Sequence, residues 1–300
     1  MTGPQTTEWL QAGCKLNLFL HINGRRNDGY HELQTYFQLL DYGDELRIET
    51  GDNSGVIHVE WIAGDEDLRG RPTQPEDDLL YRAAQLLRDE AQHRGFCLSD
   101  TVCSARITLR KHVPVGGGLG GGSAAAAQVL LELNRQWQLG FSVDELAALG
   151  KLLGADVPVF LYGKSAMAHG IGEKLLPGPL ADVPPAFLIL VPDRIISTAS
   201  LFASPNLERD AEKQPDQLLR ERWQEDSFNA FESVVLADDP ALRALHQDLS
   251  ALAGFARLTG AGACLFAPVD SPERGVRIGK KLSEGHPVLR RFIVAGAKRI

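Results

Sequence analysis

Alternating hydrophobic and polar residues predict strands near both ends of this chain. Residues 15–22 alternate strictly, so three leucines share one face of a strand. Lys15 and Asn17 lie on its other face, either on a solvated surface or as functional groups. Similar patterns predict further strands at residues 44–49, 56–61, 105–110, 187–191, 264–267 and 291–295.

Helical spacing marks other segments of the chain. Residues 79–91 place their apolar side chains on one helical face, and Ser142 with Glu145 forms a capping box ahead of residues 146–153. Composition and spacing predict further helices at residues 124–133, 242–253 and 271–283. Strands at the start with helices and strands after them indicate an α+β protein rather than a doubly wound parallel sheet.

A glycine-rich loop connects the strand at residues 105–110 to the helix at 124–133. Six of the seven residues from Gly116 to Gly122 are glycine. Glycine lets a ligand approach the backbone, and the first N–H groups of a helix have no partner within it. A flexible linker or a tight crossing is the alternative, although linkers rarely lead straight from a strand into an alanine-rich helix. The loop therefore predicts a phosphate site.

This phosphate loop is of neither common type. Gly116, Gly118 and Gly121 satisfy G-x-G-x-x-G, but over a hundred residues precede them, unlike the loop of a dinucleotide fold. A Walker loop needs a lysine where the chain has Gly122 followed directly by Ser123.

A second segment, Gly154-Ala-Asp-Val-Pro158, allows two interpretations of its aspartate. Gly154 suits a left-handed cap for the preceding helix, and Asp156 suits the N-cap of a new helix with Pro158 in its first turn. Asp156 could instead be a catalytic carboxylate at the start of that helix. The local pattern favours capping.

Composition limits the classes of function. With 300 residues, 44% of them hydrophobic, the chain can form one large domain or two moderate ones. A net charge of −8 argues against general binding of nucleic acids or anionic membranes. The N-terminus has no signal-peptide pattern, and the longest apolar run, residues 186–191, is too short to span a bilayer. Its four cysteines have no metal-ligand spacing. We expect a cytoplasmic protein with reduced thiols.

Three motifs in order resemble those of the galactokinase, homoserine kinase, mevalonate kinase and phosphomevalonate kinase (GHMP) superfamily. They are Lys15-Leu-Asn-Leu, the loop from Pro114 to Ala125 and Leu258-Thr-Gly-Ala-Gly-Ala. The resemblance implies a two-domain α+β fold with a ribosomal-S5-like N-terminal domain, a ferredoxin-like C-terminal domain and an active site in the cleft. The expected domains are residues 1–165, which bind ATP, and residues 166–300, which complete the substrate site.

Within this superfamily, Asp28-Gly-Tyr-His-Glu-Leu-Gln-Thr35 and Gly154-Ala-Asp-Val-Pro158 are similar to the 4-diphosphocytidyl-2-C-methyl-D-erythritol kinases. That resemblance implies ATP-dependent phosphorylation of the 2-hydroxyl group of this diphosphocytidyl polyol, in the methylerythritol phosphate route to isoprenoid precursors. ATP and Mg²⁺ would be required. The expected partners are small molecules, with no nucleic acid or membrane, and the protein would be a monomer or homodimer.

The resemblance also implies roles for individual residues. Asp156 would accept the hydroxyl proton, Lys15 would lie beside it and offset charge on the phosphoryl group, and Asn17 would orient the substrate. Tyr30 and Phe202 would sandwich the cytosine, His31 would read its edge, and Thr198 would contact the substrate. The residues expected to bind ATP are Lys111, Pro114, Gly116, Gly117, Gly118, Leu119, Gly120, Gly121, Gly122 and Ser123.

The chain departs from the family pattern in places. Asp77-Asp78 stands where the family often has an asparagine near the adenine, and Ala261 lacks a hydroxyl found there in relatives. Homoserine or mevalonate kinase activity is the alternative within the superfamily, but it would not explain Tyr30 and His31 followed by Phe202. A non-catalytic nucleotide-binding regulator would have no need of both Lys15 and Asp156, and the long segment before the loop disfavours a nicotinamide enzyme.

Overall fold

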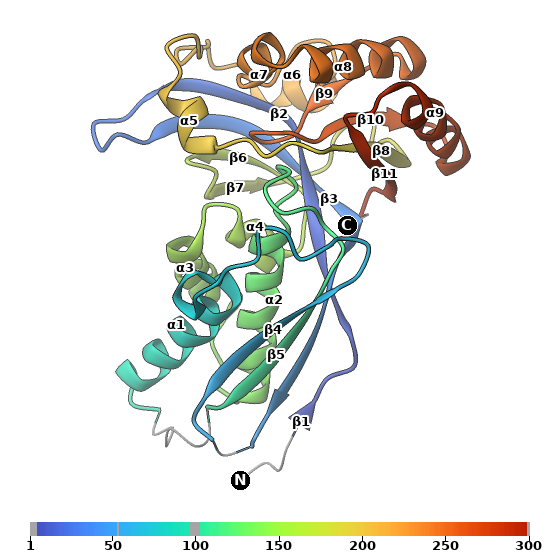
Figure 1. The fold of residues 1–300 in the computed structure, drawn as a ribbon. Helices are drawn as coiled ribbons and strands as arrows, with labels where there is room; N and C mark the ends of the chain where they lie inside the picture. Colours follow the sequence, from blue (N-terminus) through green and yellow to red (C-terminus); the bar gives the residue numbers. More distant parts are fainter. Residues whose placement is uncertain (1–4, 53, 97–102, 299–300) are drawn as a thin grey trace. The chain divides into compact units, whose positions relative to one another are not determined.

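The computed structural model describes residues 5–52, 54–96 and 103–298 (Figure 1). The chain divides into two compact units whose segments alternate along the sequence. Unit 1 comprises residues 1–14, 42–115 and 120–163, and unit 2 comprises 15–41, 116–119 and 164–300. The functional division into residues 1–165 and 166–300 stays a prediction.

Unit 1 has a layer of helices on one side of its strands (Figure 1). The last part of β3 pairs antiparallel with β5, which pairs parallel with β4 at the edge of the sheet. Apolar side chains of these strands and helices form one core. The elements of unit 1 are β1 (Gln5–Thr6), β3 (His31–Thr50, shared with unit 2), β4 (Ile57–Ala63), η1 (Pro75–Asp77), α1 (Leu79–His93), β5 (Ala105–Lys111), α2 (Gly121–Gln136), α3 (Val143–Leu153) and α4 (Val157–Tyr162).

Local sequence signals determine several boundaries in unit 1. Asp78 caps α1 by accepting a hydrogen bond from the Leu80 amide at 2.8 Å. The predicted capping box of Ser142 and Glu145 is present at the start of α3. α2 begins earlier and ends later than predicted, because its first turn includes the last glycines of the loop.

Unit 2 contains a second, four-stranded antiparallel sheet in the order β11-β8-β10-β9. Helices α8 and α9 pack against this sheet. The first part of β3 pairs with β2 and β6, and β7 extends that sheet. The elements of unit 2 are β2 (Leu10–Arg25, shared with unit 1), β6 (Ala166–Gly170), β7 (Lys174–Pro177), β8 (Ala186–Pro192), α5 (Thr198–Ala203), α6 (Asp216–Glu221), α7 (Glu232–Asp238), α8 (Pro240–Ala253), β9 (Arg257–Leu258), β10 (Leu265–Val269), α9 (Pro272–Gly285) and β11 (Leu289–Gly296).

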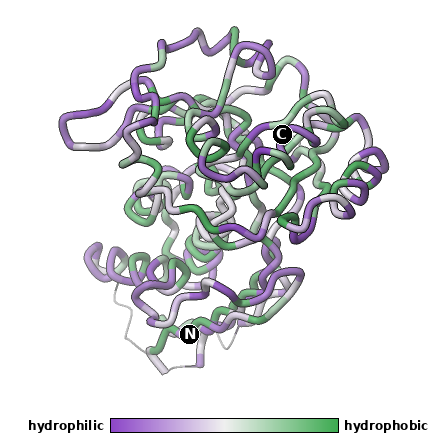
Figure 2. The backbone as a smooth tube through the Cα atoms, turned by 45° about the horizontal axis from the view of Figure 1, so that its top comes forward, coloured by the Kyte–Doolittle hydropathy of each residue, from purple (hydrophilic) through white to green (hydrophobic). Residues whose placement is uncertain are grey.

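β2 is buried on both faces along its central part. Lys15, Asn17 and His21 are between 1% and 3% exposed, so the interpretation of their face as a solvated surface is wrong. The Leu20 amide donates to the Phe228 carbonyl, and the Asn17 amide donates to Thr259 Oγ1. These distant residues cover this part of the strand. Polar residues instead occupy the turn that joins β2 to β3, drawn in blue in Figure 1 and coloured as hydrophilic in Figure 2.

Two further sequence expectations concern membrane-spanning segments and the state of the cysteines. No helix among residues 5–52, 54–96 and 103–298 is long and apolar enough to cross a membrane. Cys14, Cys103 and Cys264 are buried and form no disulfide with one another, whereas Cys97 lies outside the described residues.

Candidate active site

The glycine loop has a backbone that other residues adopt only with strain. Gly116, Gly118 and Gly120 have φ values of 72°, 79° and 70°, in the left-handed region. At Gly118 a Cβ atom would also lie 2.1 Å from the carbonyl oxygen of Thr259. Glycine at this position is therefore required both by conformation and by space.

Carbonyl groups of loop residues 117–119 accept hydrogen bonds from other residues of unit 2. Lys15 Nζ donates to the Gly118 oxygen at 2.9 Å, the Lys15 amide donates to the Leu119 oxygen at 2.9 Å, and the Cys264 amide donates to the Gly117 oxygen at 3.3 Å. An anion site is formed by N–H groups without competing carbonyl oxygens. Engagement of these carbonyls by the protein is thus consistent with a phosphate loop.

The first turn of α2 follows directly in unit 1. Gly120 is its N-cap residue and contributes no side-chain hydrogen bond, so the amides of Gly121, Gly122 and Ser123 are not capped from that position. The Ser123 hydroxyl is near Gly154, since a Cβ atom there would lie 3.8 Å from Ser123 Oγ. Within unit 1, the loop end therefore lies beside the segment that carries Asp156.

Asp156 occupies the N-cap position of α4, which has Pro158 in its first turn as predicted. Its side chain nevertheless makes no capping hydrogen bond, and its backbone is helical, with φ −84° and ψ −14°. A capping aspartate normally has an extended backbone and accepts a hydrogen bond from the helix. Gly154 is extended (φ 175°), so the left-handed cap predicted there is wrong.

Lys15 is part of a buried polar network in unit 2. Its ammonium group donates to Asn17 Oδ1 and to the Gly118 carbonyl, and lies 5.6 Å from the centre of the Phe37 ring. Asn17 Nδ2 donates to Thr35 Oγ1 at 2.8 Å, and the Asn17 amide donates to Thr259 Oγ1 at 2.9 Å. The network links the central part of β2 to the loop and to the C-terminal motif. The predicted proximity of Lys15 to Asp156 concerns residues of different units and stays a prediction.

Lys111 forms a buried ion pair in unit 1. Its Nζ lies 2.5 Å from Asp44 Oδ2, with both side chains at most 3% exposed. The other carboxylate oxygen accepts hydrogen bonds from the amides of His112 and Val113, at 2.7 and 2.8 Å. Asp44 therefore holds the turn that leads from β5 into Pro114 and the glycine loop, whereas contact of Lys111 with the nucleotide stays a prediction.

His31 and Phe202 stack on one another in unit 2. Their ring centres are 4.6 Å apart and their planes differ by 13°. His31 Nε2 is buried and has no hydrogen-bond partner among the described residues. Burial lowers the pKa of His31, and the positive charges of Arg209 and Arg25 lower it further.

The other two predicted substrate residues are more open. Tyr30 is 60% exposed, and its amide donates to Asp28 Oδ1 at 3.1 Å. Thr198 is the exposed first residue of α5. The structure therefore pairs Phe202 with His31, and contact of Tyr30 or Thr198 with a substrate stays a prediction.

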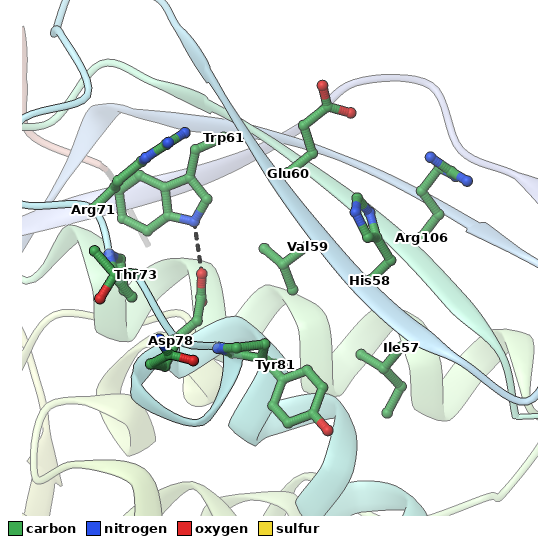
Figure 3. A pocket seen from close by; sticks show the side chains of 13 residues that line it. Ile57, His58, Val59, Glu60, Trp61, Arg71, Thr73, Asp78, Tyr81 and Arg106 are labelled. Carbon is green, nitrogen blue, oxygen red and sulfur yellow. Dashed lines mark hydrogen bonds between the residues drawn. The ribbon is translucent and has the colours of Figure 1, made fainter.

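A cavity of about 740 Å³ lies in unit 1 between β4, η1 and the start of α1. Figure 3 shows Trp61 directed toward Asp78, whose Oδ2 accepts a hydrogen bond from the indole nitrogen at 2.8 Å. Since the other oxygen of Asp78 caps α1, both are engaged within the protein. Asp78 thus anchors Trp61 and begins a helix.

Sequence reasoning assigns no role to several residues that support this site. Asp44, Thr35 and Thr259 are buried polar residues whose partners lie far away in the sequence. Arg257 is another such residue: it donates to the Leu18 carbonyl at 2.8 Å, and burial lowers its pKa to about 10. A polar residue within an otherwise apolar strand was the available signal, but the pattern alone does not name its partner.

Comparison with known proteins identifies the family of this chain. The family model described as GHMP kinases N terminal domain matches residues 78–164, and GHMP kinases C terminal matches residues 203–287. A 4-diphosphocytidyl-2-C-methyl-D-erythritol kinase of Haemophilus ducreyi is 45% identical, over 90% of this chain and 88% of the relative. The chain belongs to the GHMP kinase family. A Pseudomonas paraeruginosa protein of the same name is 43% identical to this kinase, over 96% of the chain and 93% of the relative.

Solved structures agree with the assignment of this kinase. A crystal structure of 4-(cytidine 5'-diphospho)-2C-methyl-D-erythritol kinase has a TM-score of 0.76 and 29% identity, covering 97% of this chain and all of the other. Homoserine kinase from Cytophaga hutchinsonii has a TM-score of 0.67 at 16% identity, covering 99% and 96% of the two chains, and supports the fold alone. The predicted two-domain α+β fold of the family is confirmed.

Proposed function

We propose that this kinase transfers the γ-phosphate of ATP to the 2-hydroxyl group of 4-diphosphocytidyl-2-C-methyl-D-erythritol. The observation that carries the substrate assignment is the buried Nε2 of His31 beside the stacked ring of Phe202. The names of relatives more than 40% identical support the same substrate. In this role the protein would act in the methylerythritol phosphate route to isoprenoid precursors.

The geometry of His31 and Phe202 suits a planar base with hydrogen-bonding edges. A base that bonds to Nε2 in the plane of the imidazole would lie nearly parallel to the Phe202 ring, because the two rings differ by 13°. It would gain stacking and a hydrogen bond together. The lowered pKa of His31 favours neutral imidazole, which has one donor and one acceptor nitrogen. Tyr30 would add the second aromatic surface.

In the proposed reaction, individual side chains position the reacting groups and stabilise their charge. Asp156 accepts the proton of the substrate hydroxyl, and the Lys15 ammonium offsets negative charge on the transferred phosphoryl group. Asn17 orients the hydroxyl-bearing part of the substrate, and Thr198 contacts that substrate. Phosphoryl transfer requires mainly positioning and charge stabilisation, with modest assistance from a base.

The ATP phosphates are proposed to bind the amides of the glycine loop and the first turn of α2. Lys111 and Pro114 would flank this site. Among the described residues, no group of three or more His, Cys, Asp or Glu side chains could hold a metal ion. Mg²⁺ commonly binds through substrate phosphates, water and few protein oxygens, which fits the half-buried Ser123 hydroxyl as a ligand. When bound, Mg²⁺ would neutralise phosphate charge.

A direct assay tests the proposed function. Purified protein with ATP, Mg²⁺ and 4-diphosphocytidyl-2-C-methyl-D-erythritol should form ADP and a monophosphorylated cytidyl product, detected by coupled spectrophotometry and mass spectrometry. Homoserine and mevalonate serve as comparison substrates and should give no product. Turnover of either of them, without turnover of the cytidyl substrate, would refute the proposal.

Replacing His31 by alanine should weaken binding of the cytidyl substrate selectively. We expect its KM to rise roughly 10-fold to 100-fold, the effect of losing a buried hydrogen bond and a stacking partner. The KM for ATP should remain unchanged in steady-state kinetics. His286→Ala removes a histidine of unit 2 that bonds to Asp248 instead, and should change neither constant. Equal effects of His31→Ala on both substrates would contradict cytosine recognition by this residue.

A further inference from the structure

A chain of buried hydrogen bonds in unit 2 ends at the ammonium group of Lys15. Thr35 Oγ1 donates to the Phe19 carbonyl and accepts from Asn17 Nδ2, while Asn17 Oδ1 accepts from Lys15 Nζ. Lys15, Asn17 and Thr35 are each at most 3% exposed. Water therefore offers little replacement for a bond that is lost from this chain.

The direction of every bond in the chain follows from its two ends. The lysine ammonium can only donate, so the oxygen of the Asn17 amide must face it. Its nitrogen then faces Thr35, whose hydroxyl must accept that bond and send its own proton to the Phe19 carbonyl, which can only accept. Lys15 and Thr35 thus favour the same orientation of the Asn17 amide from its two ends.

We propose that Thr35 is a positioning residue, which acts through Asn17 to hold the Lys15 ammonium for phosphoryl transfer. This inference rests on the proposed function, in which Lys15 stabilises the transferred group. Thr35 itself is 1% exposed, and its hydroxyl serves both as donor and as acceptor within the protein, so we expect it to act through Asn17.

Two further contacts make the chain rigid. The backbone amide of Asn17 donates to Thr259 Oγ1 at 2.9 Å, which fixes the backbone from which the Asn17 side chain extends. Lys15 also donates to the Gly118 carbonyl at 2.9 Å, so its ammonium is held between β2 and the glycine loop. The Asn17 side chain is the remaining movable group, and Thr35 holds its nitrogen end.

Thr35→Val keeps the shape of the side chain and removes the hydroxyl. The Asn17 amide nitrogen then loses its acceptor, so the side chain is held at its oxygen end alone and can shift together with the Lys15 ammonium. We expect kcat to fall roughly 10-fold to 100-fold, as for a small displacement of a catalytic group. KM for both substrates should change less than about threefold, because no binding group is removed. Thr35→Ser should restore kcat.

Thr50→Val is the matched control on the same strand. Thr50 is also buried, and its hydroxyl donates to Gln136 Oε1 at 2.6 Å within unit 1. It takes no part in the hydrogen bonds that lead to Lys15. Its loss should lower stability by a similar amount and leave kcat unchanged. If Thr50→Val lowers kcat as Thr35→Val does, the effect is general destabilisation and the positioning role is wrong.

Two measurements separate failure of this inference from failure of the proposed function. Turnover of the cytidyl substrate by the wild-type protein tests the proposed function first. If it is observed, the double variant Thr35→Val/Asn17→Ala should have a kcat no more than about twofold below that of Asn17→Ala alone. In ligand-free protein, NMR should show slow exchange of the Asn17 side-chain amide protons, faster in Thr35→Val but not in Thr50→Val. Additive losses of kcat, or unchanged exchange, would overturn the positioning role whatever the substrate.

Discussion

Asp156→Asn is expected to lower kcat for phosphoryl transfer roughly 100-fold to 10,000-fold, the range by which a positioned base accelerates proton transfer. An amide of the same shape cannot accept the hydroxyl proton. The side chain makes no capping bond to α4, so this loss should not arise from an unravelled helix. Rapid-quench single-turnover kinetics measures the chemical step without product release.

Binding and stability measurements distinguish a base from a structural residue. The Kd for ATP of Asp156→Asn, measured by calorimetry, should change less than about threefold. Asp144→Asn is a control in the same unit, since Asp144 is exposed in the first turn of α3 and accepts a bond from the Tyr162 hydroxyl at 2.6 Å. Wild-type turnover by Asp156→Asn would show that Asp156 is not the catalytic base and only marks the start of α4.

Asp44→Ala is expected to cost about 3–5 kcal/mol of unfolding free energy, because it leaves the Lys111 ammonium buried without its carboxylate. The amides of His112 and Val113 lose their acceptor as well. Asp44→Asn should cost less, since the remaining oxygen can still accept from these amides. Urea titration followed by circular dichroism measures both changes.

The neighbouring ion pair gives a control for this prediction. Glu45 pairs with Arg110 at 2.7 Å, but the two side chains are 36% and 35% exposed. Glu45→Ala should therefore cost less than about 1 kcal/mol. An equally small cost for Asp44→Ala would show that the buried pair does not stabilise the turn before the glycine loop.

Signals contained in a few adjacent residues were predictable from the sequence. The apolar face of α1, the capping box of α3 and the glycine loop before α2 depend on local spacing, and the structure confirms each of them. The interpretation of the Lys15 face as solvated failed because its cover comes from distant residues such as Thr259. A period of two identifies a strand's faces but not what packs on them.

The same distinction between local signals and distant contacts applies to the predicted site. The motifs identified the kinase family, whereas the roles of Asp44 and Thr35 depend on contacts between strands and could not be derived from spacing. The buried ion pair of Lys111 with Asp44 could likewise not be predicted from the sequence. Cytoplasmic location, the oligomeric state, and contacts of Lys111, Tyr30 and Thr198 with ligands stay predictions.

The alternation of the two units along the chain has a consequence for protein synthesis. The strand of Asn17 is synthesised well before its partner Thr259, which is 242 positions later in the sequence. Arg257, which holds the Leu18 carbonyl, follows that residue by 239 positions. A nascent chain that stops before residue 257 can form neither bond, so the lysine strand gains these contacts only after residues 257–259 have been synthesised.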